Sequence, residues 1–388
     1  MGVDVVTLQA DPVLGARALW SPAVRELHAY VPGEQPQGEG WIKLNTNECP
    51  YPPSPRVLQA IKDAADERMR LYPDPTALAL RQTIAREFDL TVDQVFVGNG
   101  SDEVLAHAFC GLLRHGRPVL FPDVSYSFYP VYCALYGIVP QPVPLTADFC
   151  VRVADYRLAN GGIVLPNPNA PTGVALSLSE LTQLLEDHPR SVVIVDEAYV
   201  DFGAESAVTL INRYEQLLVV RTLSKSAALA GLRVGFAMGQ APLIEALNVV
   251  KDSFNSYPLD RLALAGAQAA LEDGTHLQDL VARVTESRQW LAGQLASIGF
   301  DCLPSSANFL FVRHERAQAA DLYAALRERR ILVRHFRQLR IENHLRITIG
   351  TQSECEALCD ALRQILSVAP LGTPPTGGEA LTAPIGTP

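Results

Sequence analysis

The chain has 388 residues and is 48% hydrophobic, which is enough for a large buried core and predicts two domains. Its formal net charge of −10, with no prominent cluster of lysines and arginines, argues against a nucleic-acid-binding surface. The seven cysteines are scattered and the eight histidines show no ligand spacing, so we expect free thiols and no metal site.

The first residues of the chain lack the positive segment and the apolar core of a signal peptide. No uninterrupted apolar stretch is long enough to cross a bilayer. We therefore predict a cytoplasmic protein with no membrane contact.

Residues 95–103 predict a short strand, a glycine turn and the start of a helix. A helix start leaves unpaired N–H groups and a partial positive charge, so it can bind phosphate. Gly100 permits close approach of the backbone, and Ser101 can serve as N-cap and as hydroxyl donor. The third glycine of the dinucleotide-binding fingerprint is absent. The segment is a candidate phosphate site, although an ordinary capped helix has the same pattern.

Two segments that follow are ambiguous. Tyr126 lies in an aromatic run, residues 124–129, and can stack on a flat ring, although such aromatics usually belong to a core. Residues 165–173 are too rich in proline, asparagine and glycine for a helix or a central strand. They predict either a plain surface turn or a rigid loop that presents an asparagine amide to a ligand.

An apolar run over residues 192–195 ends at Asp196, and Tyr199 follows three residues later. An aspartate at the carboxyl end of a buried strand can pair with a protonated pyridine nitrogen. Tyr199 can donate a hydrogen bond to the phenolic oxygen of such a ring. Asp196 can instead cap the next segment. The lysine described next favours the ring.

Lys225 follows the apolar run 217–220 and precedes a glycine-rich turn. A lysine in this position can lose its proton by desolvation and form a Schiff base with a carbonyl cofactor, usually pyridoxal phosphate. Ser224 and Arg233 are candidate ligands of the cofactor's phosphate. A surface lysine at a strand end is the alternative interpretation.

Short apolar strands alternate with helical patterns over residues 95–236, which predicts parallel βαβ units with ligands at the carboxyl ends of the strands. Long helical patterns and then strands, over residues 309–312 and 345–349, predict a smaller α+β domain. We predict four parts: an amino-terminal segment joining the small domain (1–45), a large cofactor-binding domain (46–260), the small domain (261–367) and a disordered tail (368–388).

Four motifs occur in a fixed order: GNGSDE, NPNAPTG, DEAY and RTLSKSAALAGLRVG. Together they resemble the fold-type I pyridoxal-phosphate aminotransferases, and within them the histidinol-phosphate aminotransferases. The resemblance runs from about residue 30 to about residue 366 and includes the segments 44–48, 70–75, 331–334 and 345–351. It implies an α/β fold with a mostly parallel central sheet flanked by helices and a smaller α+β domain.

The resemblance implies roles for the residues around the cofactor ring. Lys225 would bind pyridoxal phosphate and move a proton between the substrate's α carbon and the cofactor's C4′. Asp196 would pair with the pyridine nitrogen, Tyr199 would contact the phenolic oxygen, and Tyr126 would stack on the ring. The remaining implied cofactor ligands are Gly100, Ser101, Asp102 through its backbone N–H, Ser224, Arg233 and, from the neighbouring subunit of a homodimer, Tyr72.

For the substrates, the resemblance implies that Arg346 binds the α-carboxylate of an amino donor or its equivalent, while Tyr30 and Arg334 contact the far end. Asn47 joins them as a substrate-binding candidate. The expected reaction moves the amino group of histidinol phosphate to 2-oxoglutarate by ping-pong kinetics, as part of histidine biosynthesis. An aromatic amino-acid aminotransferase and a phosphothreonine decarboxylase remain alternatives, because fold and cofactor do not separate them. A non-catalytic regulatory protein is disfavoured by the presence of Lys225.

The chain departs from the family pattern at one position. The family's loop has asparagine directly before Pro-Thr-Gly, whereas this chain has Ala170. Either Asn169 or Asn167 takes over the contact with the cofactor, and we favour Asn169.

Overall fold

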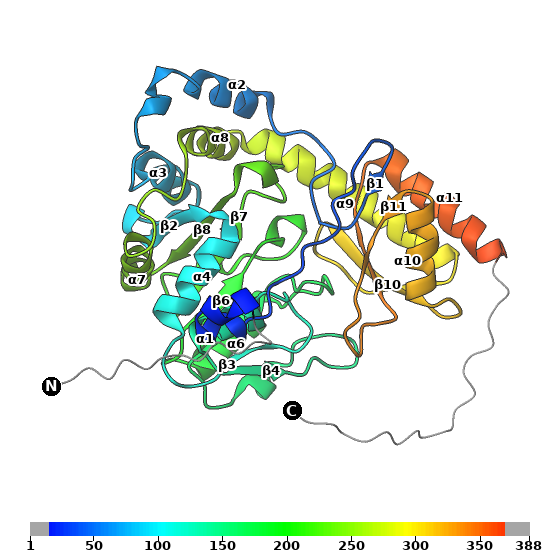
Figure 1. Cartoon of the computed structure of the whole chain (residues 1–388), viewed down its shortest axis with the longest axis horizontal. Coiled ribbons are helices and arrows are strands. Elements are labelled where there is room, and N and C mark those ends of the chain that lie inside the picture. Colours follow the sequence, from blue (N-terminus) through cyan, green and yellow to red (C-terminus); the bar gives the residue numbers. More distant parts are fainter. Residues whose placement is uncertain (1–14, 369–388) are drawn as a thin grey trace.

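The computed structural model describes residues 15–368. The predicted tail after Val368 and the first fourteen residues of the predicted amino-terminal segment lie outside this range. A seven-stranded sheet forms the centre of the larger part of the molecule, in the order β2-β8-β7-β6-β5-β3-β4 (Figure 1). Its strands are β2 (Val95–Asn99), β3 (Val119–Pro122), β4 (Pro140–Val143), β5 (Gly162–Pro166), β6 (Val193–Asp196), β7 (Leu217–Thr222) and β8 (Val234–Gly239).

The sheet is mostly parallel, as predicted, but β8 runs antiparallel to both of its neighbours, β7 and β2. The parallel βαβ units predicted over residues 95–236 therefore do not extend to β8. The connection between β7 and β8, residues 223–233, contains only a single short 3-10 turn. A connection without a crossover helix returns the chain antiparallel.

Both faces of the central sheet are covered, because successive side chains of a strand point to opposite faces. In β6, Val193 and Val195 join one apolar core, while Ile194 joins the other. The first core includes side chains from α2 (Pro55–Ala64), α3 (Leu78–Glu87), α6 (Leu178–Asp187) and α8 (Arg261–Leu271). The second includes side chains from α4 (Gly100–Leu112), α5 (Tyr129–Tyr136) and α7 (Ala241–Asp252).

The carboxyl-terminal part contains a four-stranded antiparallel sheet of β9 (Phe300–Cys302), β10 (Phe309–His314), β12 (Arg334–His335) and β13 (Leu345–Thr348). The helices α9 (Gly274–Ser297), α10 (Ala319–Glu328) and α11 (Gln352–Val368) pack with it. From the amino-terminal side, β1 (Ile42–Lys43) pairs in parallel with β11 (Ile331–Leu332) (Figure 1). Leu44 is buried in the same apolar core. These contacts fit an amino-terminal segment that joins the small domain, and the division of the chain stays a prediction.

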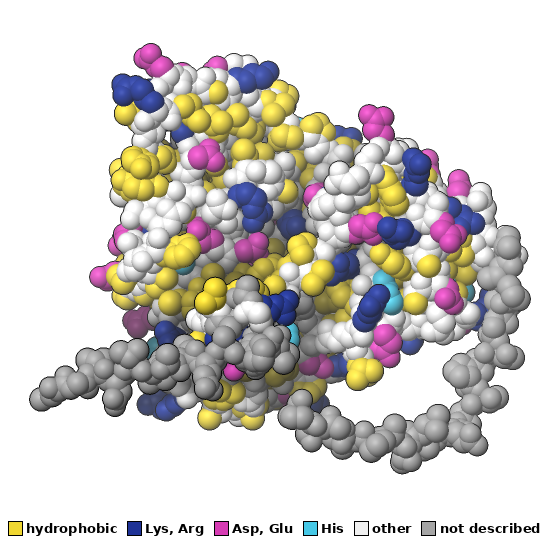
Figure 2. Space-filling model, viewed as in Figure 1, with side chains coloured by type: hydrophobic (Ala, Val, Ile, Leu, Met, Phe, Trp, Pro, Cys, Tyr) yellow, Lys and Arg dark blue, Asp and Glu magenta, His cyan; other side chains and the backbone are white. Residues whose placement is uncertain are grey.

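Among the helices between residues 15 and 368, none has the length and apolar character needed to span a membrane. Apolar side chains gather on the surface over α2, α3 and α8 (Figure 2). Exposed large apolar residues of this region are Leu58, Met69, Leu71, Tyr72 and Leu78.

Candidate active site

A cavity of about 420 Å³ lies at the carboxyl ends of β6 and β7, beside the amino terminus of α4. Residues from the amino-terminal segment and from β12 and β13 close its other side. Most of the predicted site residues line it together: Tyr30, Asn47, Ser101, Asp102, Tyr126, Asp196, Tyr199, Ser224, Lys225, Arg233, Arg334 and Arg346. The sheet edge predicted from the sequence is therefore the edge at which these side chains meet.

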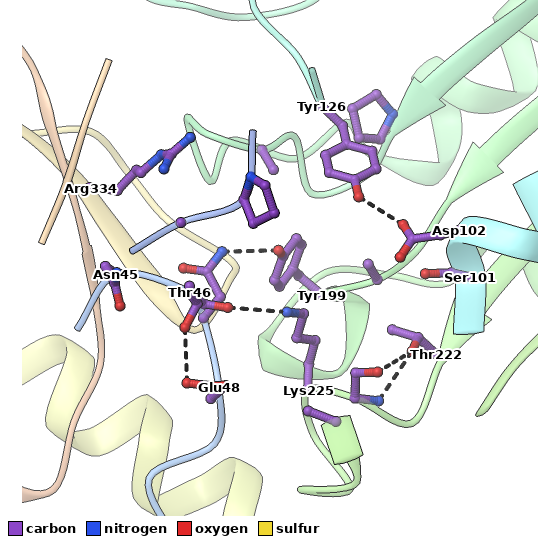
Figure 3. Close-up of a pocket in the computed structure, with 18 of the residues that line it drawn as sticks. Asn45, Thr46, Glu48, Ser101, Asp102, Tyr126, Tyr199, Thr222, Lys225 and Arg334 are labelled. Carbon is purple, nitrogen blue, oxygen red and sulfur yellow. Dashed lines mark hydrogen bonds between the residues drawn. The ribbon is translucent and has the colours of Figure 1, made fainter. Parts of the chain in front are cut away.

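Lys225 lies near the middle of this cavity (Figure 3). Its side chain leaves the segment after β7, is partly buried, and donates a hydrogen bond of 3.4 Å from Nζ to the Thr46 carbonyl. The amine lies 5.6 Å from the centroid of the Tyr199 ring. This hydrogen bond is long and weak, so the amine is available to a ligand in the cavity.

Asp196 ends β6 with its side chain buried. Burial raises the pKa of its carboxyl to about 6. The Tyr129 hydroxyl donates a hydrogen bond of 2.9 Å to Oδ2, and the Ala198 N–H donates one of 3.3 Å to Oδ1. These two donors favour the charged form, and a cation in the cavity would favour it further.

The phosphate-binding candidate is the start of α4. The helix begins at Gly100, with Asn99 in the N-cap position and no side-chain capping bond, so the prediction of Ser101 as N-cap is wrong by two positions. Ser101 instead lies in the first turn and lines the cavity. A Cβ on Gly235 would lie 2.3 Å from the Ser101 backbone nitrogen. Glycine at this position of β8 is therefore what allows the helix terminus to approach so closely.

Several polar side chains form a cluster around the amino terminus of α4. Arg233 Nη2 lies 3.2 Å from Asp102 Oδ2, and the Tyr126 hydroxyl donates a hydrogen bond of 2.8 Å to Asp102 Oδ1. The Thr222 hydroxyl donates to Ser224 Oγ at 2.9 Å, so the Ser224 hydroxyl keeps its own proton for another acceptor. With the N–H groups of the first helical turn, these donors suit an anion such as phosphate.

Two arginines face the cavity from the carboxyl-terminal part. Arg334 and Arg346 are register partners on the antiparallel strands β12 and β13. Arg346 donates a hydrogen bond of 3.0 Å from Nη2 to the Asn45 carbonyl. Its Nε has no hydrogen-bond partner among the described residues, and burial lowers the pKa of its guanidinium. Paired guanidinium groups on a wall of the cavity favour a carboxylate or phosphate ligand.

Asn169 does not line the cavity. It is buried, and its Nδ2 donates hydrogen bonds to the Val124 carbonyl at 3.0 Å and to Thr172 Oγ1 at 2.9 Å. Asn167 is held by hydrogen bonds with the backbone of Leu176. Ala170 lines the cavity. The loop thus brings a methyl group to the wall, and this geometry does not favour the predicted contact between Asn169 and the cofactor.

Two more predicted residues lie outside the cavity lining, Gly100 behind Ser101 and Tyr72 on the surface. Tyr72 is 79% exposed and stacks on Tyr257 with ring centroids 4.7 Å apart. An exposed tyrosine fits a contact with a second subunit, which stays a prediction.

Several residues near the ligand space were absent from the predicted set. Tyr129 belongs to the aromatic run 124–129, but no pattern in the sequence indicates its contact with Asp196, because the two residues are 67 positions apart. The segment 44–48 was recognised as a motif, but only Asn47 was selected from it. The other missed lining residues include Asn45, Thr46, Glu48, Ala170 and Thr222.

Comparison with known proteins decides the family. The model of the aminotransferase class I and II family matches residues 39–362. The chain belongs to this family. The predicted fold class and the predicted aminotransferase are thereby confirmed.

The chain is similar to proteins that are named histidinol-phosphate aminotransferase. Histidinol-phosphate aminotransferase 1 of Bradyrhizobium diazoefficiens is 60% identical over 347 residues, which cover 89% of this chain and 99% of that protein. The protein of the same name from Methylococcus capsulatus is 58% identical over 348 residues, which cover 90% of this chain and 98% of that protein. The resemblance to histidinol-phosphate aminotransferases is therefore confirmed over most of this chain.

A solved structure shares its fold. Histidinol-phosphate aminotransferase from Sinorhizobium meliloti, in complex with pyridoxal-5′-phosphate, superposes with a TM-score of 0.80. The match covers 90% of this chain and 98% of that one at 24% sequence identity. At this identity the likeness bears on the fold alone.

Proposed function

We propose that this aminotransferase uses pyridoxal phosphate to transfer the amino group of histidinol phosphate to 2-oxoglutarate, producing imidazole acetol phosphate and glutamate in histidine biosynthesis. The observation that carries the proposal is the layout of the cavity. Arg334 and the helix terminus at Ser101 lie on opposite sides of Lys225 (Figure 3). One anion site suits the cofactor's phosphate, and the other remains for an anionic substrate.

The residues present fit the cofactor. When bound, pyridoxal phosphate supplies an aldehyde that takes up the amino group and a ring that accepts electrons from the substrate's α carbon. The buried Asp196 carboxylate would hold the positive charge on the ring nitrogen. Lys225 Nζ would hold the cofactor and then move the proton at the substrate's α carbon. The phosphate would be bound by the first turn of α4 with Ser101, Ser224 and Arg233.

The two arginines explain how a single cavity can accept both substrates. Histidinol phosphate carries a phosphate, and 2-oxoglutarate carries two carboxylates. Arg334, which is partly exposed, would bind the phosphate of one substrate or the side-chain carboxylate of the other. Arg346, with its unpaired Nε, would bind the second anionic or polar group. Tyr30 packs on Phe128 with ring centroids 4.6 Å apart and would cover the far end of the substrate.

The proposal includes a cytoplasmic homodimer with shared active sites. The exposed apolar surface over α2 and α3 includes Tyr72, and a second copy of the chain would cover it. Tyr72 would then reach the phosphate of the partner's cofactor. We also propose the division into an amino-terminal segment that joins the small domain, a large domain and a small domain, because Leu44 belongs to the carboxyl-terminal core.

The experiment mixes cofactor-loaded protein with one amino donor at a time and follows the absorbance of the cofactor. The donors are histidinol phosphate, phenylalanine and phosphothreonine. Rapid bleaching by histidinol phosphate, reversed by 2-oxoglutarate, is the expected result. Bleaching by phenylalanine alone would move the substrate to the aromatic amino acids. Release of carbon dioxide from phosphothreonine would replace the transaminase by a decarboxylase.

A further inference from the structure

A chain of two hydrogen bonds, the first buried and the second partly buried, runs from Thr348 through Asn47 to the hydroxyl of Tyr199. The Asn47 amide donates from Nδ2 to Tyr199 Oη at 2.9 Å, the dashed line that ends on Tyr199 in Figure 3. The Thr348 hydroxyl donates to Asn47 Oδ1 at 3.0 Å. Asn47 and Thr348 are only 1% and 2% exposed, so water does not compete for the bond between them. The chain joins the amino-terminal segment, β13 and the segment after β6.

The direction of each bond follows from the donors and acceptors present. Thr348 Oγ1 already accepts the backbone N–H of Asn47 at 3.0 Å, and its own proton needs an acceptor, which Asn47 Oδ1 provides. That assignment leaves Asn47 Nδ2, which is only a donor, facing Tyr199. With the amide turned over, the buried Thr348 proton would lose its acceptor, which costs free energy. Tyr199 therefore accepts from Asn47, and its own proton is available to the cavity.

Two hydrogen bonds hold the backbone of the segment around Asn47, one at Asn47 itself and one at Leu44. Asn308 donates a hydrogen bond of 3.0 Å from Nδ2 to the Asn47 carbonyl, and the Thr348 N–H donates one of 3.0 Å to the Leu44 carbonyl. The φ angle of Asn47 is 56°, in the left-handed region that asparagine and aspartate tolerate better than most residues. A residue fixed in this way is suited to orient its neighbour.

We propose that Asn47 is a positioning residue that keeps the Tyr199 proton directed into the cavity, where it serves as the hydrogen-bond donor to the ring oxygen of the cofactor. This inference rests on the proposed function and replaces the substrate-binding role first predicted for Asn47. The loop 167–173 directs no side-chain amide into the cavity, because Ala170 brings a methyl group to the wall and the Asn169 amide is already hydrogen-bonded. The Tyr199 hydroxyl would therefore supply the hydrogen bond to the ring oxygen.

The test is a variant that keeps the shape of Asn47 and reverses its bond to Tyr199. In Asn47→Asp, one carboxylate oxygen still accepts from Thr348, while the other accepts the Tyr199 proton and draws it out of the cavity. The readout is the pH midpoint of the absorbance change of the bound cofactor, measured without substrate. A hydrogen-bond donor beside the ring oxygen stabilises negative charge on that oxygen. The bound cofactor therefore loses its titrating proton at a lower pH. Losing the donor should raise the midpoint by roughly half to one pH unit.

Companion variants separate positioning from a general structural effect. Tyr199→Phe should raise the midpoint by the same amount, and Asn47→Asp should add nothing in the double variant. Thr348→Val frees the Asn47 amide and should raise the midpoint by a smaller amount. Thr348→Ser keeps the hydroxyl and should leave the midpoint at the wild-type value. Asn160→Asp changes a buried amide that donates to Leu158 O instead, and it should leave the midpoint unchanged. Thermal unfolding of the cofactor-free variants identifies any that fail to fold, and the Thr348 pair then decides.

The outcomes are distinct. The positioning role would be overturned if Tyr199→Phe raises the midpoint while Asn47→Asp or Thr348→Val keeps the wild-type value. The proposed function would then remain intact. Additive shifts in the double variant would also overturn it, because Asn47 would then act independently of Tyr199. A wild-type protein that gains no absorbance with pyridoxal phosphate would overturn the proposed function, and this inference with it.

Discussion

Tyr129, the first residue of α5, donates a hydrogen bond of 2.9 Å from its hydroxyl to Asp196 Oδ2, and both side chains are buried. Burial raises the pKa of Asp196 to about 6, and the bond from Tyr129 opposes that rise. Tyr129 thus helps to keep the carboxylate charged where the proposed ring nitrogen would meet it.

Tyr129→Phe should weaken the binding of pyridoxal phosphate. Without the hydroxyl, the pKa of Asp196 rises further and the carboxylate pairs less well with a cationic ring. We expect the dissociation constant at neutral pH to rise by roughly three- to tenfold, as for the loss of one hydrogen bond. Tyr156→Phe is the matched control, because that buried hydroxyl has no partner among residues 15–368. Equal cofactor affinity in both variants would contradict the role of Tyr129.

Asp196→Asn should change the pH dependence of stability in the cofactor-free protein. Asp196 has a folded-state pKa of about 6, against the ordinary 3.8, so the native state binds more protons than the unfolded chain between these values. The free energy of unfolding therefore falls as the pH rises through this window. Asparagine removes the effect, and the variant should be more stable than wild type by about 2–3 kcal/mol at neutral pH.

The difference between wild type and Asp196→Asn should vanish as the pH falls below 3.8, the ordinary pKa of aspartate, because the carboxyl is then protonated in both the folded and the unfolded chain. Urea unfolding at a series of pH values measures it. A constant difference at every pH would mean that the effect does not come from the titration of Asp196.

Gly235→Ala should disrupt the phosphate site. The added Cβ would lie 2.3 Å from the Ser101 nitrogen and 2.4 Å from the Gly100 carbonyl carbon, so the helix terminus must move. We expect at least about a tenfold loss of cofactor affinity and a loss of about 1–3 kcal/mol in unfolding free energy. Gly231→Ala is the control, since, apart from its own local backbone and chain neighbours, no described atom lies within 4 Å of its added Cβ. Cofactor titration and urea unfolding of the two variants should differ sharply.

Arg334→Ala should reduce the use of the phosphate-bearing donor selectively. Loss of a charged hydrogen bond should lower kcat/KM for histidinol phosphate by roughly ten- to a hundredfold. The half-reaction with a donor whose side chain is uncharged, such as phenylalanine, should not slow. Arg337→Ala removes an exposed arginine from the same segment and should have little effect on either donor. A parallel loss with both donors would assign Arg334 a structural role instead.

Lys225→Ala should abolish transamination, because its amine both holds the cofactor and moves the proton in the proposed reaction. The loss should be at least about a thousandfold in single-turnover measurements. Lys62→Ala, which removes an exposed lysine from α2, should retain full activity. Full turnover in the Lys225 variant would overturn the chemistry proposed for this site.

The sequence by itself located the local elements and the residues whose chemistry is unusual for their surroundings. The apolar run 217–220 became β7 (Leu217–Thr222), and the run 192–195 became β6 (Val193–Asp196). Lys225 and Asp196 stood out because each is a charged residue close to the carboxyl end of an apolar strand, and both line the cavity. Local pattern suffices for such predictions, since strands and their ends depend mainly on neighbouring residues.

Only the tertiary structure decided which side chains meet across long sequence separations. Tyr129 and Asp196 are 67 residues apart, and Asn47 and Tyr199 are 152 apart. The pairing of Arg334 with Arg346 follows from the register of β12 against β13, and the direction of β8 follows from its short connection. Which residue of the loop 167–173 faces the ligand also depends on the backbone path, which turns Ala170 inward and Asn169 away. Such contacts form when packing brings distant segments together, and no periodicity within one segment records them.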